Sequence, residues 1–83
     1  MPKYFVYILK SINFPERYYK GFTTNIDTLL ARHNSGQSNH TSKYRPWEII
    51  YYCVFTNKKT ALAFEKYLKT ASGIAFMRKR LIK

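Results

Sequence analysis

One carboxylate in this chain, Glu65, stands where an acidic side chain is not expected. In the segment 57–70, residues recur on one helical face and form an apolar stripe, whose members are Ala61, Phe64, Leu68 and, just beyond, Ala71. Glu65 is one turn beyond Ala61 and falls inside that stripe. A carboxylate turned toward a core costs desolvation free energy unless a cation or a hydrogen-bond donor meets it.

Three interpretations of Glu65 stay open at this point. It pairs with Lys69 at the edge of the stripe, a common arrangement four residues apart on a helix, or it pairs internally with an arginine or a tyrosine. Alternatively it holds a divalent cation beside a phosphate, because Mg²⁺ needs only one or two protein carboxylates besides water. The pattern alone favours Lys69. The formal net charge of +11, from fifteen Lys and Arg against four acidic residues, favours the metal–phosphate site.

Near the start of the chain, two aromatic-rich apolar runs carry the candidate functional side chains. Tyr4–Leu9 and Tyr18–Thr23 flank a polar break and predict two antiparallel strands. Each has a tyrosine near its centre, Tyr7 in the first and Tyr19 in the second, and the second contains Gly21. A glycine in that place indicates unusual dihedral angles or the close approach of another group, such as a phosphate, although a plain turn is the commoner reason.

The next part of the chain predicts a helix and a loop. Thr24 and Asn25 are N-cap residues for a helix that ends near Asn34. The residues on its predicted buried face are Ile26, Leu29, Leu30 and His33. The polar segment 37–46 has no period and predicts a loop that is either a solvated connector or a source of donors to a phosphate backbone.

A third strand and two more helices complete the predicted order ββαβαα. The strand Trp47–Phe55 is almost continuously apolar, which is typical of the middle of a covered sheet. Asn57 caps a helix through about Thr70, and the Ser72–Gly73 pair predicts a break before a final helix, Ile74–Leu81. The predicted fold class is α+β, with a three-stranded antiparallel sheet flanked by helices.

Size and charge limit the class of protein. A chain of 83 residues with 46% hydrophobic content is expected to form a single domain over residues 1–83. The excess of positive charge predicts a polyanionic partner, with nucleic acid ahead of an acidic membrane surface. One cysteine and two histidines are too few for a zinc site. Without a membrane-length apolar run or a signal-peptide pattern, we expect a cytoplasmic protein that is not inserted in a membrane.

The chain resembles the GIY-YIG nuclease domain, and in particular its small stand-alone bacterial members. The resemblance starts from V-Y-I at Val6–Ile8 and Y-K-G at Tyr19–Gly21. It continues through His33-Asn34, RPWEIIYY at Arg45–Tyr52 and ALAFEKYLK at Ala61–Lys69, and so covers nearly the whole chain. It implies a metal-dependent endonuclease that hydrolyses phosphodiester bonds, with DNA as the expected partner.

The resemblance also implies a role for each matching residue. Glu65 corresponds to the family's single metal-binding glutamate and would hold Mg²⁺ or Mn²⁺. Tyr19 matches the tyrosine that activates or positions the attacking water, and Tyr7 lines the site near the scissile phosphate. His33 matches a helix histidine that binds phosphate or relays a proton in some members. Gly21 lets the backbone come close to the substrate.

One departure from the family pattern bears on catalysis. The family places an arginine ten positions after the second-strand tyrosine, and this chain has Leu29 there. Loss of one preorganised donor from such a site typically lowers the rate by ~10²–10³. Arg32 is one turn further on, close enough to substitute but expected on a neighbouring helix face. An endonuclease, either active or impaired, therefore competes with a catalytically silent DNA- or RNA-binding module, or a basic protein-interaction domain.

Several residues are predicted to contact nucleic acid directly. Two belong to the polar loop, two to the basic C-terminal run 77–83, and the others to the second strand and the first helix. They are Lys20, Gly21, Arg32, Lys43, Arg45, Arg78 and Arg80.

Overall fold

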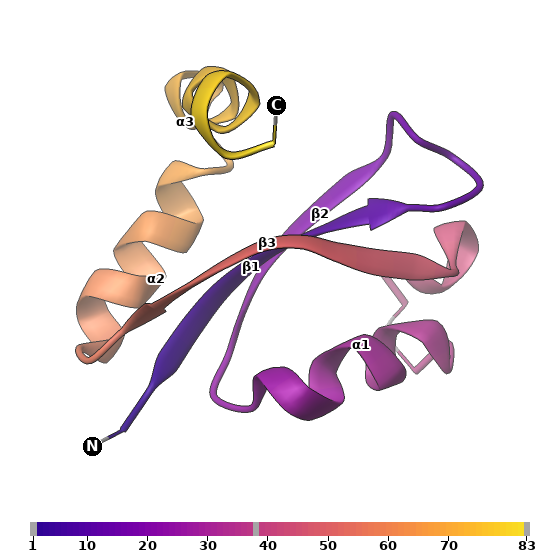
Figure 1. Ribbon diagram of the computed structural model, residues 1–83, viewed down its shortest axis with the longest axis horizontal. Helices are drawn as coiled ribbons and strands as arrows, with labels where there is room; N and C mark the ends of the chain where they lie inside the picture. Colours follow the sequence, from indigo (N-terminus) through magenta and orange to yellow (C-terminus); the bar gives the residue numbers. More distant parts are fainter. Residues whose placement is uncertain (1, 38, 83) are drawn as a thin grey trace.

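Strand β1 (Tyr4–Ser11) is the centre of the fold. In this computed structural model, which describes residues 2–37 and 39–82, β1 pairs antiparallel with β2 (Tyr18–Thr23) and with β3 (Trp47–Phe55) in a sheet of order β2-β1-β3 (Figure 1). Residues Phe5 to Leu9 are all buried, because the sheet is covered on both faces at this strand. The predicted α+β class and ββαβαα order are confirmed.

The prediction that the third strand forms the middle of the sheet is wrong, because β3 is an edge strand. The register between β1 and β3 shifts between Ile8 and Leu9, so Ile50 is an extra residue opposite them. A bulge of this kind interrupts the alternation of side chains between the two faces of the sheet. Apolar residues can therefore follow one another in the sequence without a polar residue between them. Beyond the bulge the alternation returns, and Tyr52 and Val54 are about half exposed.

The two faces of the sheet carry separate cores. Helix α2 (Lys58–Tyr67) covers one face, whose core contains Val6, Ile8, Ala61, Leu68 and Met77. Helix α1 (Ile26–Asn34) covers the other, whose core contains Tyr7, Leu9, Leu29 and Trp47. Successive side chains of β1 alternate between these cores, as the pleat of a strand requires. The two helices therefore lie on opposite sides of the sheet (Figure 1).

Helix α1 has the bounds that its capping residues predict. The side chain of Asn25 accepts a hydrogen bond from the backbone N–H of Asp27 at 3.1 Å, and the last helical residue is Asn34. In the loop that follows, a short 3₁₀-helix, η1 (Ser42–Tyr44), stands where the sequence predicts no regular structure.

The boundary between the last two helices differs from the prediction. Helix α2 begins after its cap Asn57 but ends at Tyr67, before the expected Thr70. Thr70 instead caps α3 (Ala71–Phe76), where its hydroxyl accepts a hydrogen bond from the N–H of Gly73 at 3.0 Å. The predicted break at Ser72–Gly73 is therefore wrong. A Cβ on Gly73 would clash with the carbonyl of Tyr67, so this glycine permits close packing.

The π-helical turn η2 (Met77–Leu81) continues α3, so the last helical segment begins earlier than the predicted Ile74. Among residues 2–37 and 39–82, no helix combines the length and the hydropathy that a membrane span needs.

Candidate active site

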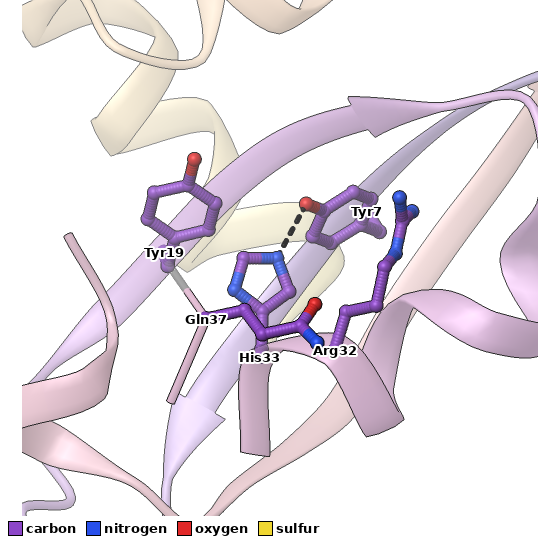
Figure 2. A pocket seen from close by; sticks show the side chains of 5 residues that line it. All are labelled: Tyr7, Tyr19, Arg32, His33 and Gln37. Atoms are coloured by element: carbon purple, nitrogen blue, oxygen red, sulfur yellow. Dashed lines mark hydrogen bonds between the residues drawn. The ribbon is translucent and has the colours of Figure 1, made fainter. Parts of the chain in front are cut away.

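A pocket of about 270 Å³ opens between the sheet and the C-terminal half of α1. Its lining comes from β1, β2, α1 and the loop after α1, and consists of Tyr7, Tyr19, Arg32, His33 and Gln37 (Figure 2). The fold thus brings together four residues that the sequence analysis selects from three separate segments. Their chemical roles stay predictions.

Tyr7 and His33 form a buried hydrogen-bonded pair in this pocket. The Tyr7 hydroxyl lies 2.9 Å from His33 Nε2, and the two residues are only 4% and 9% exposed (Figure 2). The ring of Tyr19 lies beside both, with its centroid 5.2 Å from that of His33 and 6.4 Å from that of Tyr7. Three rings with polar atoms therefore pack against one another at the base of the pocket.

Gly21 makes room for this pair. A Cβ on Gly21 would clash with the hydroxyl of Tyr7, which is its antiparallel neighbour on β1. The close approach expected at Gly21 is therefore made by the Tyr7 side chain. A direct contact between Gly21 and nucleic acid stays a prediction.

The surroundings of the pair set its protonation at neutral pH. Burial raises the pKa of Tyr7 well above its ordinary value, the neighbouring Tyr19 and Glu65 raise it further, and the charge of Arg32 opposes them. Burial, with a smaller effect of Arg32, lowers the pKa of His33. Both groups are thus neutral near pH 7, and Tyr7 is suited to donate a hydrogen bond and not to act as a base.

Arg32 brings a positive charge into the pocket that Leu29 does not supply. Leu29 is 1% exposed and packs in the core with Tyr7 and Trp47, which agrees with its apolar place on the helix. The sequence predicts Arg32 on a neighbouring helix face but close enough to substitute, and its long side chain lines the pocket (Figure 2). Its Nη2 lies 3.5 Å from the Thr23 hydroxyl, and its charge acts on both Tyr7 and His33.

Glu65 stands apart from this lining. Its Oε2 forms an ion pair of 2.7 Å with Lys69, the first of the three interpretations, and its side chain is 18% exposed. Helix α2 packs on the sheet face opposite the pocket, yet the charge of Glu65 contributes to the raised pKa of Tyr7. A joint site of Glu65 with Tyr7 and Tyr19 stays a prediction.

The donor set limits how a divalent ion could be held. Within the part of the chain that the structure describes, no three residues among His, Cys, Asp and Glu gather into a ligand cluster. An ion at Glu65 would therefore have one protein carboxylate as a ligand, and its other ligands would be water and substrate oxygens. Mg²⁺ is commonly coordinated in this way. The ion pair with Lys69 engages Oε2, so a cation at this carboxylate would lie beside the Lys69 ammonium or displace it.

Comparison with known proteins decides the family. The family model of the GIY-YIG catalytic domain matches residues 3–78. The chain belongs to the GIY-YIG family. A UPF0213 protein of Staphylococcus haemolyticus is 36% identical over 73 residues, which cover 87% of each chain. A UPF0213 protein of Streptococcus pyogenes is 34% identical over 68 residues, or 81% of this chain and 72% of the relative.

A solved structure supports the same fold. The solution NMR structure of the UPF0213 protein BH0048 from Bacillus halodurans has a TM-score of 0.56, with 24% identity, and the match covers 93% of this chain and 83% of that one. The ββαβαα arrangement is therefore shared with a small bacterial protein.

The other residues predicted to contact nucleic acid divide into two groups. Burial lowers the pKa of Lys20 on β2, and the nearby charges of Lys69 and Arg78 lower it further. Lys20, Lys69 and Arg78 therefore form a basic cluster at the side of β2 that faces η2, and η2 also carries Arg80.

Lys43 and Arg45 belong instead to the loop before β3. The Lys43 ammonium lies 5.8 Å from the centre of the Tyr44 ring. The guanidinium of Arg45 occupies the space beside Gly36, whose φ of +84° favours glycine. Neither residue lines the pocket.

Two residues in or beside this pocket have no individual signal in the sequence. Gln37 lines the pocket, and Thr41 places its hydroxyl 2.7 Å from His33 Nδ1. Both belong to the polar segment 37–46, where the only sequence indication is a general richness in donors. Their positions depend on how the loop folds back over α1.

We predict that His33 makes the protein less stable as the pH falls below about 6.5, the ordinary pKa of an unfolded histidine. Because burial lowers the pKa of His33 in the folded state, the unfolded chain binds the proton first. The stabilisation is present above that pH and is lost as the pH falls through the folded pKa. Urea unfolding at about pH 7.5 and about pH 5 should show a larger decrease in the free energy of unfolding for the wild type than for His33→Gln. Equal losses would contradict the assignment.

Proposed function

We propose that this GIY-YIG protein is a divalent-metal-dependent endonuclease that hydrolyses phosphodiester bonds in DNA in the cytoplasm. The observation that carries the proposal is the presence of Arg32 in one pocket with Tyr7, Tyr19 and His33. Because Leu29 removes the family's usual arginine, the guanidinium of Arg32 is the group that gives a phosphate a cationic partner in this pocket.

Each pocket residue has a role that suits its surroundings. Arg32 would bind a non-bridging phosphate oxygen, since a guanidinium forms strong charge-assisted hydrogen bonds with phosphate. Tyr7, kept protonated by burial, would donate a hydrogen bond to the same phosphate. Tyr19, at the pocket wall, would position the attacking water.

Glu65 is the residue that would hold Mg²⁺ or Mn²⁺. Such an ion would stabilise negative charge on the phosphate and on the leaving oxygen. The partial burial of Glu65 and the effect of its charge on Tyr7 support this assignment, and bound DNA would supply the remaining oxygen ligands.

A second candidate function is a nucleic-acid-binding module without catalysis. It is favoured by the ion pair of Glu65 with Lys69 and by the absence of Glu65 from the pocket lining. In that case the basic cluster of Lys20, Lys69 and Arg78 would carry the function by contacts to the phosphate backbone.

We predict that Arg32→Ala lowers cleavage of a DNA substrate with Mg²⁺ or Mn²⁺ by ~10²–10³, the usual effect of removing one preorganised donor. Lys59→Ala is the matched control, because it also removes one exposed positive charge but lies in the first turn of α2. Single-turnover cleavage by the purified proteins measures the effect. An equal loss of cleavage rate in both variants would show that Arg32 contributes only to the overall positive charge, which would contradict its role in the pocket.

We also predict that Arg78→Glu combined with Arg80→Glu weakens binding to duplex DNA for all sequences alike. Binding to phosphate releases counterions, so log K falls as log salt rises. Removal of each cationic side chain that touches a phosphate should make this negative slope shallower by about 0.9. Fluorescence anisotropy over a salt series measures both quantities. The control is Lys58→Glu combined with Lys59→Glu, which reverses the same amount of exposed charge. Unchanged affinity of the Arg78/Arg80 variant at low salt would exclude η2 from the interface.

A further inference from the structure

Thr41 is a fully buried threonine whose hydroxyl faces the pocket's histidine. Its Oγ1 lies 2.7 Å from His33 Nδ1, while His33 Nε2 lies 2.9 Å from the Tyr7 hydroxyl. Thr41 is also the N-cap residue of η1, but its side chain makes no capping hydrogen bond. The usual structural reason for a threonine at a helix start therefore does not apply to it.

A hydrogen bond attaches the backbone of Thr41 to Trp47, in the core that also contains Tyr7. The indole Nε1–H of Trp47 donates to the Thr41 carbonyl at 2.8 Å, and Trp47 is 3% exposed in the core with Tyr7 and Leu29. The side chain of Asn34 fixes Trp47 in turn, since it accepts from the Trp47 N–H at 2.6 Å and donates to the Trp47 carbonyl at 3.1 Å. The position of the Thr41 hydroxyl is thus set by buried groups and not by a free loop.

The direction of the hydrogen bonds follows from counting hydrogens. Among the described residues, His33 Nδ1 is the one hydrogen-bond partner of the Thr41 hydroxyl, and a hydroxyl has one hydrogen to donate. If Nδ1 carried the imidazole hydrogen, the buried hydroxyl hydrogen would have no acceptor, at a cost of about 1–3 kcal/mol. The Tyr7 hydrogen can be met by water instead, because Tyr7 lines the open pocket, whereas the fully buried Thr41 hydroxyl has no such alternative. Thr41 therefore donates to Nδ1, and neutral His33 carries its hydrogen on Nε2.

We infer that Thr41 is a positioning residue that holds His33 as the Nε2–H tautomer, so that His33 donates to Tyr7 and the Tyr7 hydrogen is free to donate to an anionic oxygen in the pocket. The last step rests on the proposed function, which supplies a phosphate oxygen as acceptor. The tautomer itself does not depend on it.

The opposite direction of the Tyr7–His33 hydrogen bond would leave the pocket without the Tyr7 donor. If Tyr7 donated to His33, its oxygen would present only lone pairs to a ligand and would repel a phosphate. With the direction inferred here, Tyr7 joins Arg32 as a second donor in the same pocket. Gly21 leaves the space in which the Tyr7 hydroxyl is held.

The test is a two-bond ¹H–¹⁵N correlation spectrum of the uniformly ¹⁵N-labelled full chain above pH 7, with His40 as the internal comparison. We expect the wild type and Thr41→Ser to show a protonated Nε2 and an unprotonated Nδ1 at His33. Thr41→Val, which keeps the shape but removes the hydroxyl, should lose this single tautomer. A protonated Nδ1 in the wild type overturns the inference even if the valine variant fails to fold, and so does an unchanged tautomer in a folded Thr41→Val.

Cleavage gives an independent measurement. Thr41→Val should lower kcat about tenfold, the order expected from one misdirected hydrogen bond, and Thr41→Ser should restore it. Full activity in a folded Thr41→Val would overturn the link to Tyr7. If the wild type cleaves no DNA, the proposed endonuclease function fails while the spectrum still decides the tautomer.

Discussion

The buried hydrogen bond between Tyr7 and His33 is the constraint on which the rest of the site depends. Two polar side chains in the core of a small domain must find partners, because a buried donor or acceptor without one costs free energy. The pair satisfies this by joining the central strand to α1 at 2.9 Å. Gly21 leaves space for the phenol, and Thr41 occupies the far nitrogen of the imidazole. The pocket is therefore built as one unit from four parts of the chain.

The same constraint explains where the positive charge of the pocket lies. Leu29 is buried in the core with Tyr7 and Trp47, so this helix position brings no charge to the pocket. Arg32 reaches the pocket from the next turn without entering the core, since it is exposed. Glu65 approaches from the other face of the sheet and acts on Tyr7 through its charge. Arg32 thus lines the pocket, while Glu65 lies outside its lining on the helix that covers the other face.

Much of the fold could be predicted from local signals. Strand ends were marked by turn residues, and Asn25 and Asn57 marked the starts of two helices because their side chains cap the first free N–H groups. The errors arise from tertiary contacts. The bulge at Ile50 made an edge strand look like a central one, and Thr70 ended α2 by capping α3.

The candidate site was predictable in part. The family resemblance selected Tyr7, Tyr19 and His33, which the fold brings together. Helical spacing placed Arg32 on a face next to that of Leu29 and close enough to substitute for the family arginine, but it could not show that the long side chain of Arg32 reaches the pocket lining. Thr41 could not be found, because nothing in a polar loop indicates which hydroxyl will be buried against His33.

The pocket as described requires Tyr7 to stay protonated at neutral pH, and a ¹³C NMR titration of labelled tyrosine measures this, with Tyr7→Phe to assign the signal. We expect the Tyr7 Cζ resonance to keep its protonated position through about pH 10, where an ordinary tyrosine is half ionised. A Tyr7 signal that titrates with a midpoint near or below ~10 would contradict the claim that burial beside His33 keeps this phenol a hydrogen-bond donor.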